Sequence, residues 1–409
     1  MDMKKFFGLL LGVALCATGI FTKVNEDGLS VKTLENKEIS AIAEEKKDVS
    51  VYPNLGISSK AAFSMDAESG TVIYAANENQ RLPIASMCKI MTLILSFDAI
   101  KEGSLLLEEK IKVSERAASM GGSQVFLEAG GEYPVFELLK SIVVCSANDS
   151  CVAMAERLCG GELPFTEKMN ERAKSLGAEN TLFANCTGLP KEPQYSSAKD
   201  VALFLRELTK HEEYFKFAKI WTDRFQHPKG RYTDISNTNR LVRFYDGCDG
   251  GKTGFTNQAG FCLAATAKRG GMRIISVVIG GETSDKRFQD VRSMFDYAFA
   301  TFTLKTTVDC NNLLNERAEV SSGKVKSISV RPQRSSYIFS KKGEEQALQI
   351  EIKMKDKVKA PVKVGDKVGE IVVYQNSVEI DRIGIVANEQ VEKAGFYDRL
   401  KEIAENYKF

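Results

Sequence analysis

The sequence contains very little histidine, almost no excess of charge and no long apolar run outside its amino terminus. Only two histidines, His211 and His227, occur in 409 residues, and we expect both at the surface. They cannot supply a three-histidine zinc site, and their scarcity argues against a histidine-based triad. A net charge of +2, without a basic run carrying interleaved aromatics, gives no support for nucleic-acid binding. No later span of about 20 apolar residues exists, which excludes an integral membrane helix at the carboxy end.

The amino terminus has the layout of a secretory signal peptide. Lys4 and Lys5 precede the apolar run 6–15, and small residues follow. We therefore expect a signal peptide over 1–22 and an exported protein; the family resemblance described below implies a location at the outer face of the cytoplasmic membrane or in the cell wall. A lipoprotein modified at Cys16 is the alternative, although Leu15 is a poor residue before a modified cysteine. The segment 23–50 is rich in Glu and Lys, lacks aromatics, and is predicted to be a charged linker.

Nine cysteines in an exported chain raise the question of a disulfide framework. They are scattered through apolar segments instead of gathering in loops, and the chain is long enough to fold without such cross-links. We therefore expect mostly buried free thiols.

The first of three short polar strings, Ser86-Met87-Cys88-Lys89, combines a hydroxyl and an amine. Residues three apart are neighbours on a helix, so Lys89 can reach the Ser86 hydroxyl, whereas Cys88 points to roughly the opposite side. Pro83 suits a helix start, and the apolar run 90–95 predicts a buried helix. At such a start the helix dipole favours negative charge, and a lysine removed from water can act as a base.

Two further strings complete the set. Ser146-Ala147-Asn148 follows an apolar helix predicted over 136–144 and is expected in a polar loop. Lys252-Thr253-Gly254 is expected to begin a strand over 252–256, whose edge can bind an extended peptide. Gly254 lets a substrate approach the backbone closely. Each string alone is weak evidence, but their order and context together predict one site for serine-based acyl transfer.

The three strings are those of penicillin-binding proteins and class A β-lactamases. Further segments extend the likeness, so that the chain resembles a D-alanyl-D-alanine carboxypeptidase, a low-molecular-mass penicillin-binding protein of serine peptidase family S11. The resemblance covers roughly residues 51–304. One departure is Gly251, where many relatives carry a branched apolar residue; we expect glycine to loosen the strand there. The segments that carry the resemblance are 81–86, 122–127, 130–132, 148–156, 188–189, 195–200, 249–256 and 259–261.

A chain of 409 residues exceeds the usual size of one hydrophobic core, which predicts two domains. The resemblance implies an α+β fold. Its first part would be a penicillin-binding/β-lactamase-like catalytic domain over 51–305, with an antiparallel sheet flanked by helices and an all-helical subdomain over about 95–210. Strand-like runs over 259–267 and 273–279 surround a hairpin signal, and Ser284-Asp285 is expected to cap the next helix.

The pattern changes after residue 306. Short alternating runs over 327–330, 349–352 and 371–374 predict a small all-β sandwich domain over 306–390. In the last segment, 391–409, apolar residues recur with helical spacing. The resemblance implies an amphipathic helix lying on the membrane surface, and a helix packed on the β domain is the alternative. The apolar residues of that face are Phe396, Leu400, Ile403 and Tyr407.

The resemblance also implies the reaction. The enzyme would remove the terminal D-alanine from peptidoglycan stem pentapeptides through a serine acyl-enzyme, in cell wall biogenesis, and β-lactams would acylate the same serine. No metal or other cofactor is implied. An oxyanion hole would form from the backbone amides of Ser86 and Phe255. The implied catalytic residues are Ser86, Lys89, Ser146 and Asn148, and the implied substrate-binding residues are Lys252, Thr253, Gly254 and Phe255.

Three alternatives stay open at this stage. A class A β-lactamase shares the first and third strings, but it lacks a β-rich second domain, and no Glu-x-x-Leu-Asn segment occurs here. A DD-transpeptidase differs only in its acyl acceptor, which a sequence does not reveal. An inactive wall-binding or regulatory module would have no need of intact Ser86, Lys89, Asn148 and Lys252.

Overall fold

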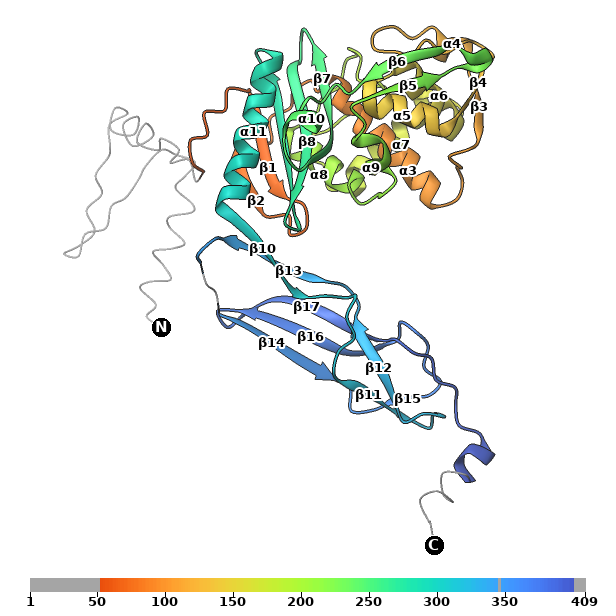
Figure 1. Ribbon diagram of the computed structural model, residues 1–409, viewed down its shortest axis with the longest axis vertical. Coiled ribbons are helices and arrows are strands. Elements are labelled where there is room, and N and C mark those ends of the chain that lie inside the picture. The colour runs from red at the N-terminus through yellow and green to blue at the C-terminus, as the bar shows by residue number, and fades with distance from the viewer. Residues whose placement is uncertain (1–51, 345–346, 401–409) are drawn as a thin grey trace, which may run out of the picture. The chain divides into compact units, whose positions relative to one another are not determined.

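The computed structural model describes residues 52–344 and 347–400 (Figure 1). From Asn54 onward these residues belong to one compact unit. The signal peptide and linker predicted over 1–50 lie outside the described residues. None of the helices in the described ranges has the length and apolarity needed to cross a bilayer.

A five-stranded antiparallel sheet forms the centre of the part of the chain before residue 302, in the order β2-β1-β9-β8-β7. The predicted hairpin is confirmed as β8 and β9. Strand β7 lies at one edge of the sheet and begins at Cys248, four residues before the predicted start, because the glycines at 250 and 251 also pair with β8. The strands are β1 (Ala61–Asp66), β2 (Val72–Ala76), β7 (Cys248–Thr256), β8 (Gly260–Arg269) and β9 (Met272–Gly281).

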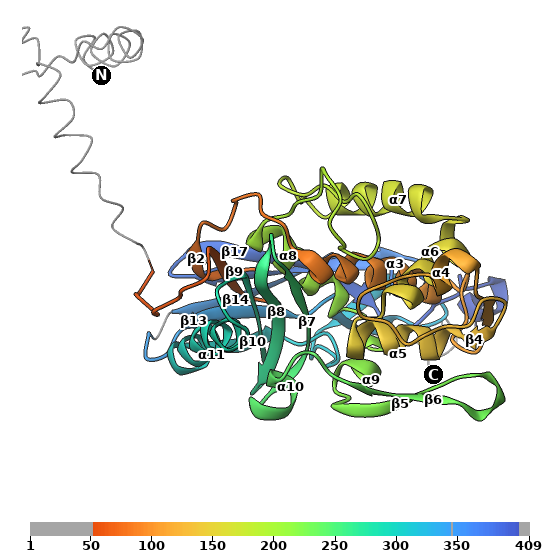
Figure 2. The same cartoon turned by 90° about the horizontal axis from the view of Figure 1, so that it is seen from above.

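Two helices pack against this sheet, α8 (Ala198–Leu208) and α11 (Ser284–Thr301), and Figure 2 shows them on opposite sides of it. Strands β1 and β9 are accordingly buried at almost every position. The predicted start of α11 was one residue late. Thr283 is the N-cap, because its side chain accepts a hydrogen bond from Lys286 N at 3.2 Å.

Several other helices pack against α3 (Lys89–Lys101), whose residues are almost all buried, as its apolar sequence predicts. The expectation of an all-helical subdomain over about 95–210 was wrong in one detail. Strand β3 (Lys110–Lys112) pairs with β4 (Glu132–Pro134), since Ile111 is buried between two exposed lysines in a period of two. A second pair, β5 (Thr222–Gln226) and β6 (Tyr232–Ser236), follows the subdomain. The helices and 3-10 turns are η1 (Ala85–Cys88), α3 (Lys89–Lys101), α4 (Glu115–Ala118), α5 (Val135–Cys145), α6 (Asn148–Cys159), α7 (Glu162–Ser175), α9 (Tyr214–Ala218), η2 (Pro228–Gly230) and α10 (Leu241–Phe244).

The expectation that both histidines lie at the surface was wrong. His211 is 8% exposed and His227 is 6% exposed. His211 stacks on Phe97, and its Nε2 lies 3.2 Å from a carboxylate oxygen of Asp98. His227 Nε2 lies 2.9 Å from Thr233 Oγ1. Each ring is buried because aromatic neighbours cover it and polar partners satisfy its nitrogens.

The carboxy-terminal part is all β, and the strand-like runs predicted in it are confirmed. A six-stranded sheet has the order β14-β16-β17-β12-β11-β15, antiparallel except for β11 and β15, and a separate pair joins β10 and β13. Residues of both sheets share one apolar core, including Val308 and Ile338 from the pair and Val373 and Ile385 from the larger sheet. The strands are β10 (Phe302–Val308), β11 (Arg317–Ser321), β12 (Ser327–Pro332), β13 (Ser336–Lys341), β14 (Leu348–Met354), β15 (Val358–Lys359), β16 (Lys367–Gln375) and β17 (Val378–Ala387).

The predicted terminal helix falls only partly within the described residues. Residues 396–400 are helical, whereas Ile403 and Tyr407 lie outside the described ranges. Phe396, Tyr397 and Leu400 are 73%, 84% and 47% exposed. The described turn therefore does not bury its apolar side chains against the β domain.

Candidate active site

The first polar string forms a 3-10 turn followed by the central helix. Ser86 is partly exposed in η1, whereas Lys89, the first residue of α3, is completely buried. Residues i and i+3 lie above one another in a 3-10 turn, and Lys89 Nζ is 3.0 Å from Ser86 Oγ. The same ammonium donates to the carbonyl oxygen of Thr187 at 2.5 Å. A hydroxyl and an amine are thus held in direct contact at the beginning of a buried helix.

Two buried lysines influence each other in this region. Lys252 on β7 is 1% exposed, and its Nζ donates to Thr253 O at 3.1 Å. Burial lowers the pKa of Lys89, and burial together with the charge of Lys89 lowers the pKa of Lys252 well below its ordinary value. The pair therefore loses its first proton at a lower pH than an exposed lysine does.

Two glycines allow β7 and the 188 loop to lie directly against the backbone of residues 84–86. A Cβ at Gly254 would lie 2.6 Å from Ile84 O and 3.2 Å from Ser86 N. A Cβ at Gly188, which has φ +79°, would overlap the carbonyl oxygen of Ala85 and lie 3.0 Å from Ser86 N. Both positions therefore require glycine, because a side chain would displace the Ser86 amide.

Gly251, which was predicted to loosen β7, lies where the strand is irregular. Its φ is +134°, and a Cβ there would overlap the carbonyl oxygen of Ala264 on β8. The pairing of β7 with β8 shifts register just before this residue, between Cys248 and Gly250. Glycine is thus the residue that this irregular stretch of the strand requires.

The second string joins two buried helices. Ser146 ends α5 with a left-handed φ of +67°, and Asn148 begins α6. Asn148 Nδ2 donates to Gly121 O at 2.7 Å, and Asn148 N donates to Ser123 O at 2.7 Å. Both Ser146 Oγ and Asn148 Oδ1 are buried and make no hydrogen bond within the described residues. These two oxygens are therefore available to a bound substrate.

The third string approaches the second through Thr238. Thr253 Oγ1 donates to Thr238 Oγ1 at 2.7 Å, and Thr238 N donates to Val144 O at 3.1 Å, two residues before Ser146. Phe255, the next residue but one on β7, is 51% exposed and stacks on Phe261 with ring centroids 4.4 Å apart. The fold thus brings elements carrying all eight predicted site residues into one region.

Arg287 was missed in the sequence. It is 9% exposed, and its Nη1 donates to Gly254 O at 3.2 Å, which places a cation against the third string. Burial lowers the pKa of Arg287 to about 10, and its Nε has no partner among the described residues. The sequence did carry a signal for a buried arginine: Arg287 lies four residues before Val291, and this spacing places it on the apolar face of α11.

The cysteines are free thiols, as expected, throughout the described part of the chain. Several surround the two lysines, but burial raises the pKa of Cys145 to about 11 and that of Cys151 to about 12. Cys88 is buried, and its thiol donates to Asn185 O at 3.1 Å. At neutral pH these thiols are protonated, which argues against a cysteine nucleophile.

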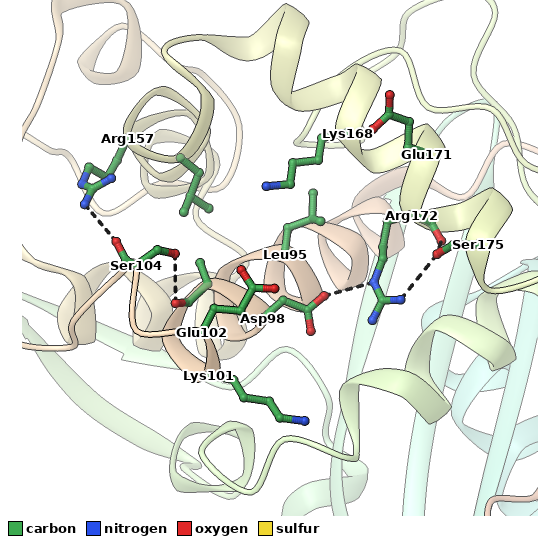
Figure 3. Close-up of a pocket in the computed structure, with 12 residues that line it drawn as sticks. Leu95, Asp98, Lys101, Glu102, Ser104, Arg157, Lys168, Glu171, Arg172 and Ser175 are labelled. Atoms are coloured by element: carbon green, nitrogen blue, oxygen red, sulfur yellow. Dashed lines mark hydrogen bonds and ion pairs between the residues drawn. The ribbon is translucent and has the colours of Figure 1, made fainter.

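A separate pocket of about 760 Å³ lies among α3, α6 and α7 (Figure 3). Within its lining Arg172 Nε donates to Asp98 at 3.0 Å, and Arg157 Nη2 donates to Ser104 O at 3.3 Å. None of the predicted site residues lines this pocket.

Substituting Gly188 with alanine tests the close approach of backbones at Ser86. We expect the rate of acylation by penicillin to fall about 100-fold, because displacement of the Ser86 amide misplaces the nucleophile. Gly177 is a matched control with the same φ of +79°, but a Cβ there meets nothing within 4 Å. Gly177→Ala should cost only about 1 kcal/mol of stability and leave acylation unchanged. Equal acylation rates for the two variants, measured beside their melting temperatures, would contradict this geometry.

Comparison with known proteins finds similarity over most of the chain. The family model described as D-alanyl-D-alanine carboxypeptidase, peptidase S11, matches residues 46–283, and the model of the penicillin-binding protein 5 C-terminal domain matches residues 302–393. The D-alanyl-D-alanine carboxypeptidase DacF of Bacillus subtilis is 41% identical over 357 residues, which cover 87% of this chain and 92% of that protein.

Solved structures show the same likeness. Penicillin-binding protein 5 from Haemophilus influenzae is 28% identical, with a TM-score of 0.66, over 82% of this chain and 98% of that one. Penicillin-binding protein D2 from Listeria monocytogenes, solved in an ampicillin-bound form, is 32% identical, with a TM-score of 0.52, over 60% of this chain and 100% of that one.

Proposed function

The chain belongs to the D-alanyl-D-alanine carboxypeptidase family of serine peptidases, S11, and on that basis we propose that Ser86 is the nucleophile of its reaction. Enzymes of this family are serine hydrolases that act on D-Ala-D-Ala, and this chain is one of them. The observation that carries the proposal is the 3.0 Å contact between Ser86 Oγ and the buried Lys89 Nζ.

In the first step Ser86 Oγ attacks the carbonyl carbon of the penultimate D-alanine while Lys89 accepts the hydroxyl proton. Lys89 must be neutral for this, and its lowered pKa makes that form accessible. The terminal carboxylate of the peptide, bound beside Lys252 and Thr253, would hold a proton on Lys252. Since the two lysines repel each other's charge, the neutral member of the pair is then Lys89.

The oxyanion of the tetrahedral intermediate would lie between the backbone amides of Ser86 and Phe255. The close packing of Gly254 against Ser86 N supports this arrangement, because Phe255 directly follows that glycine. Preorganised donors of this kind stabilise a transition state by roughly 3 kcal/mol each.

The intermediate collapses when the peptide C–N bond breaks and the departing D-alanine nitrogen takes up a proton. We assign relay of this proton to Ser146, whose buried Oγ has no partner in the described chain, and assign to Asn148 Oδ1 a hydrogen bond from the peptide backbone. Water then attacks the Ser86 ester, releasing the shortened peptide and restoring the hydroxyl. β-Lactams would acylate Ser86 in the same way.

A product assay distinguishes this function from its alternatives. We expect the purified protein to convert a diacylated tripeptide ending in D-Ala-D-Ala into the dipeptide product and free D-alanine. Mass spectrometry before and after incubation measures this conversion. Rapid penicillin turnover without D-alanine release would indicate a β-lactamase. Transfer of the acyl group to an added amine, in preference to water, would indicate a transpeptidase, and neither release nor penicillin labelling would indicate an inactive module.

We further propose where the parts of the chain act. The catalytic domain comprises 51–305 and the β domain 306–390, after a signal peptide over 1–22 and a linker over 23–50. Export would place the catalytic domain outside the cytoplasmic membrane, where peptidoglycan lies. The segment 391–409 would bind the membrane surface, and the exposure of Phe396, Tyr397 and Leu400 supports this. Loss of vesicle binding after deletion of 391–409 is the expected result.

A further inference from the structure

Asp149 is a fully buried carboxylate, one residue after Asn148, whose hydrogen bonds come from backbone amides. It is 0% exposed. Its Oδ2 accepts from Val125 N and from Leu127 N, each at 3.1 Å, and its Oδ1 accepts from Ser150 N at 2.9 Å. Burial nevertheless raises the pKa of Asp149, so this carboxylate is costly to keep in the interior. Its main contacts are with one loop.

That loop, residues 121–127, contains no helix or strand. Asn148 binds its first half and Asp149 binds its second half. Gly121 O and Ser123 O accept the two hydrogen bonds from Asn148 described above. Asp149 binds the amides that follow in the same loop. Phe126 adopts a left-handed φ of +63°, which a non-glycine residue takes only when its surroundings impose it.

The carbonyl groups of the loop are bound from the other side. Arg231 Nη2 donates to Phe126 O at 2.8 Å, and Thr233 Oγ1 donates to Val125 O at 3.3 Å. Both come from the segment of η2, β5 and β6 that lies over the loop. The loop backbone is therefore fixed through its amides by Asp149 and through its carbonyls by Arg231 and Thr233.

We propose that Asp149 is a positioning residue, which fixes loop 121–127 and through it the side-chain orientation of Asn148. The Nδ2 group of Asn148 is engaged by Gly121 O, so Oδ1 is left as the acceptor for substrate. If the loop relaxes, nothing else among the described contacts selects this orientation of the amide. The inference rests on the proposed function, because that function assigns substrate binding to Asn148.

Asp149→Asn is the direct test. A carboxamide offers one oxygen in place of two and puts an NH₂ group against the amides of the loop. We expect kcat/KM for D-alanine release to fall about 100-fold, mainly in kcat, as for a misplaced binding group. Hydrogen exchange at the amides of Val125 and Leu127 should become faster at the same time.

A double-mutant cycle separates positioning from a general structural role. In the Asn148→Ala background, Asp149→Asn should lower kcat/KM by no more than about twofold, because the group that it positions is already absent. Equal losses in both backgrounds would show that Asp149 does not act through Asn148 and would overturn the inference.

Asp290→Asn is the matched control, and Arg231→Ala is the second variant. Asp290 lies on α11 and is 2% exposed. Its side chain likewise accepts hydrogen bonds from two backbone amides, Ser58 N at 3.2 Å and Ser59 N at 2.9 Å. Its substitution should lower the melting temperature and leave kcat/KM unchanged. The Arg231 side chain is 42% exposed, so Arg231→Ala should fold even if Asp149→Asn does not, and it should also lower kcat/KM.

Failure of the inference is distinguishable from failure of the proposed function. If wild type releases D-alanine and both loop variants match it, the inference is wrong and the function stands. If wild type itself releases no D-alanine, the proposed function is wrong.

Discussion

Ser86→Ala is expected to carry no covalent label after incubation with a fluorescent penicillin and denaturation. The acyl-enzyme bond forms at Ser86 Oγ, and no other hydroxyl contacts Lys89 Nζ in the described part of the chain. We expect release of D-alanine to fall by at least about 10⁴-fold, because removal of the nucleophile leaves only substrate binding and the oxyanion hole. Ser86 is partly exposed, so the variant should fold with an unchanged melting temperature.

Ser96→Ala is the matched control for this experiment. Ser96 lies on α3, the helix that follows Ser86, is completely buried and donates to Thr92 O at 2.8 Å. Its variant should lose some stability and keep full penicillin labelling. A persistent label on Ser86→Ala, located by peptide mass spectrometry, would transfer the role of nucleophile to the labelled residue and disprove the assignment.

The second large effect is expected for Lys89→Met, which should slow acylation by about 10³-fold while raising stability at neutral pH. Loss of the general base accounts for the slower reaction. Stability should rise because the pKa of Lys89 in the folded protein lies below its ordinary value of 10.5. Between the folded pKa and 10.5 the unfolded chain binds the proton and the folded chain does not, so wild-type stability falls as the pH falls through this window. Methionine has no group to protonate, so the variant does not suffer this loss of folding stability.

The pH profile and a distant lysine complete the test. Wild-type acylation should decline as the pH falls, with an apparent pKa below 10.5, and Lys89→Met should lack that limb. Lys101, exposed at the other end of α3, is the control, and Lys101→Met should resemble wild type in both rate and profile. A Lys89→Met protein that is acylated at the wild-type rate would exclude Lys89 as the base.

The local features of the fold followed from the sequence because their causes are local. Apolar periodicity predicted α5 and the face of α11, and period-two alternation predicted the strands of the β domain. The contact of Ser86 with Lys89 required only a helical turn between residues three apart. The three strings and their neighbours were specific enough to identify the family, which the comparisons show.

Three features that the sequence did not reveal depend on residues distant in the chain. His211 was expected at the surface and is buried because Phe97 and Asp98 of α3 cover it. Gly251 was expected to loosen a strand and is required by the position of Ala264 on the neighbouring strand. Arg287 passed unnoticed because its contact with Gly254 exists only once α11 packs on the sheet.

By itself, therefore, the sequence determined which chemical groups the protein carries, which elements hold them and to which family it belongs. Only the tertiary structure decided that burial and the charge of Lys89 lower the pKa of Lys252, and that Asp149 binds the loop that holds Asn148. The physical reason is that helix and strand patterns reflect interactions over a few residues. Burial and electrostatic coupling instead arise from neighbours that only long-range packing supplies.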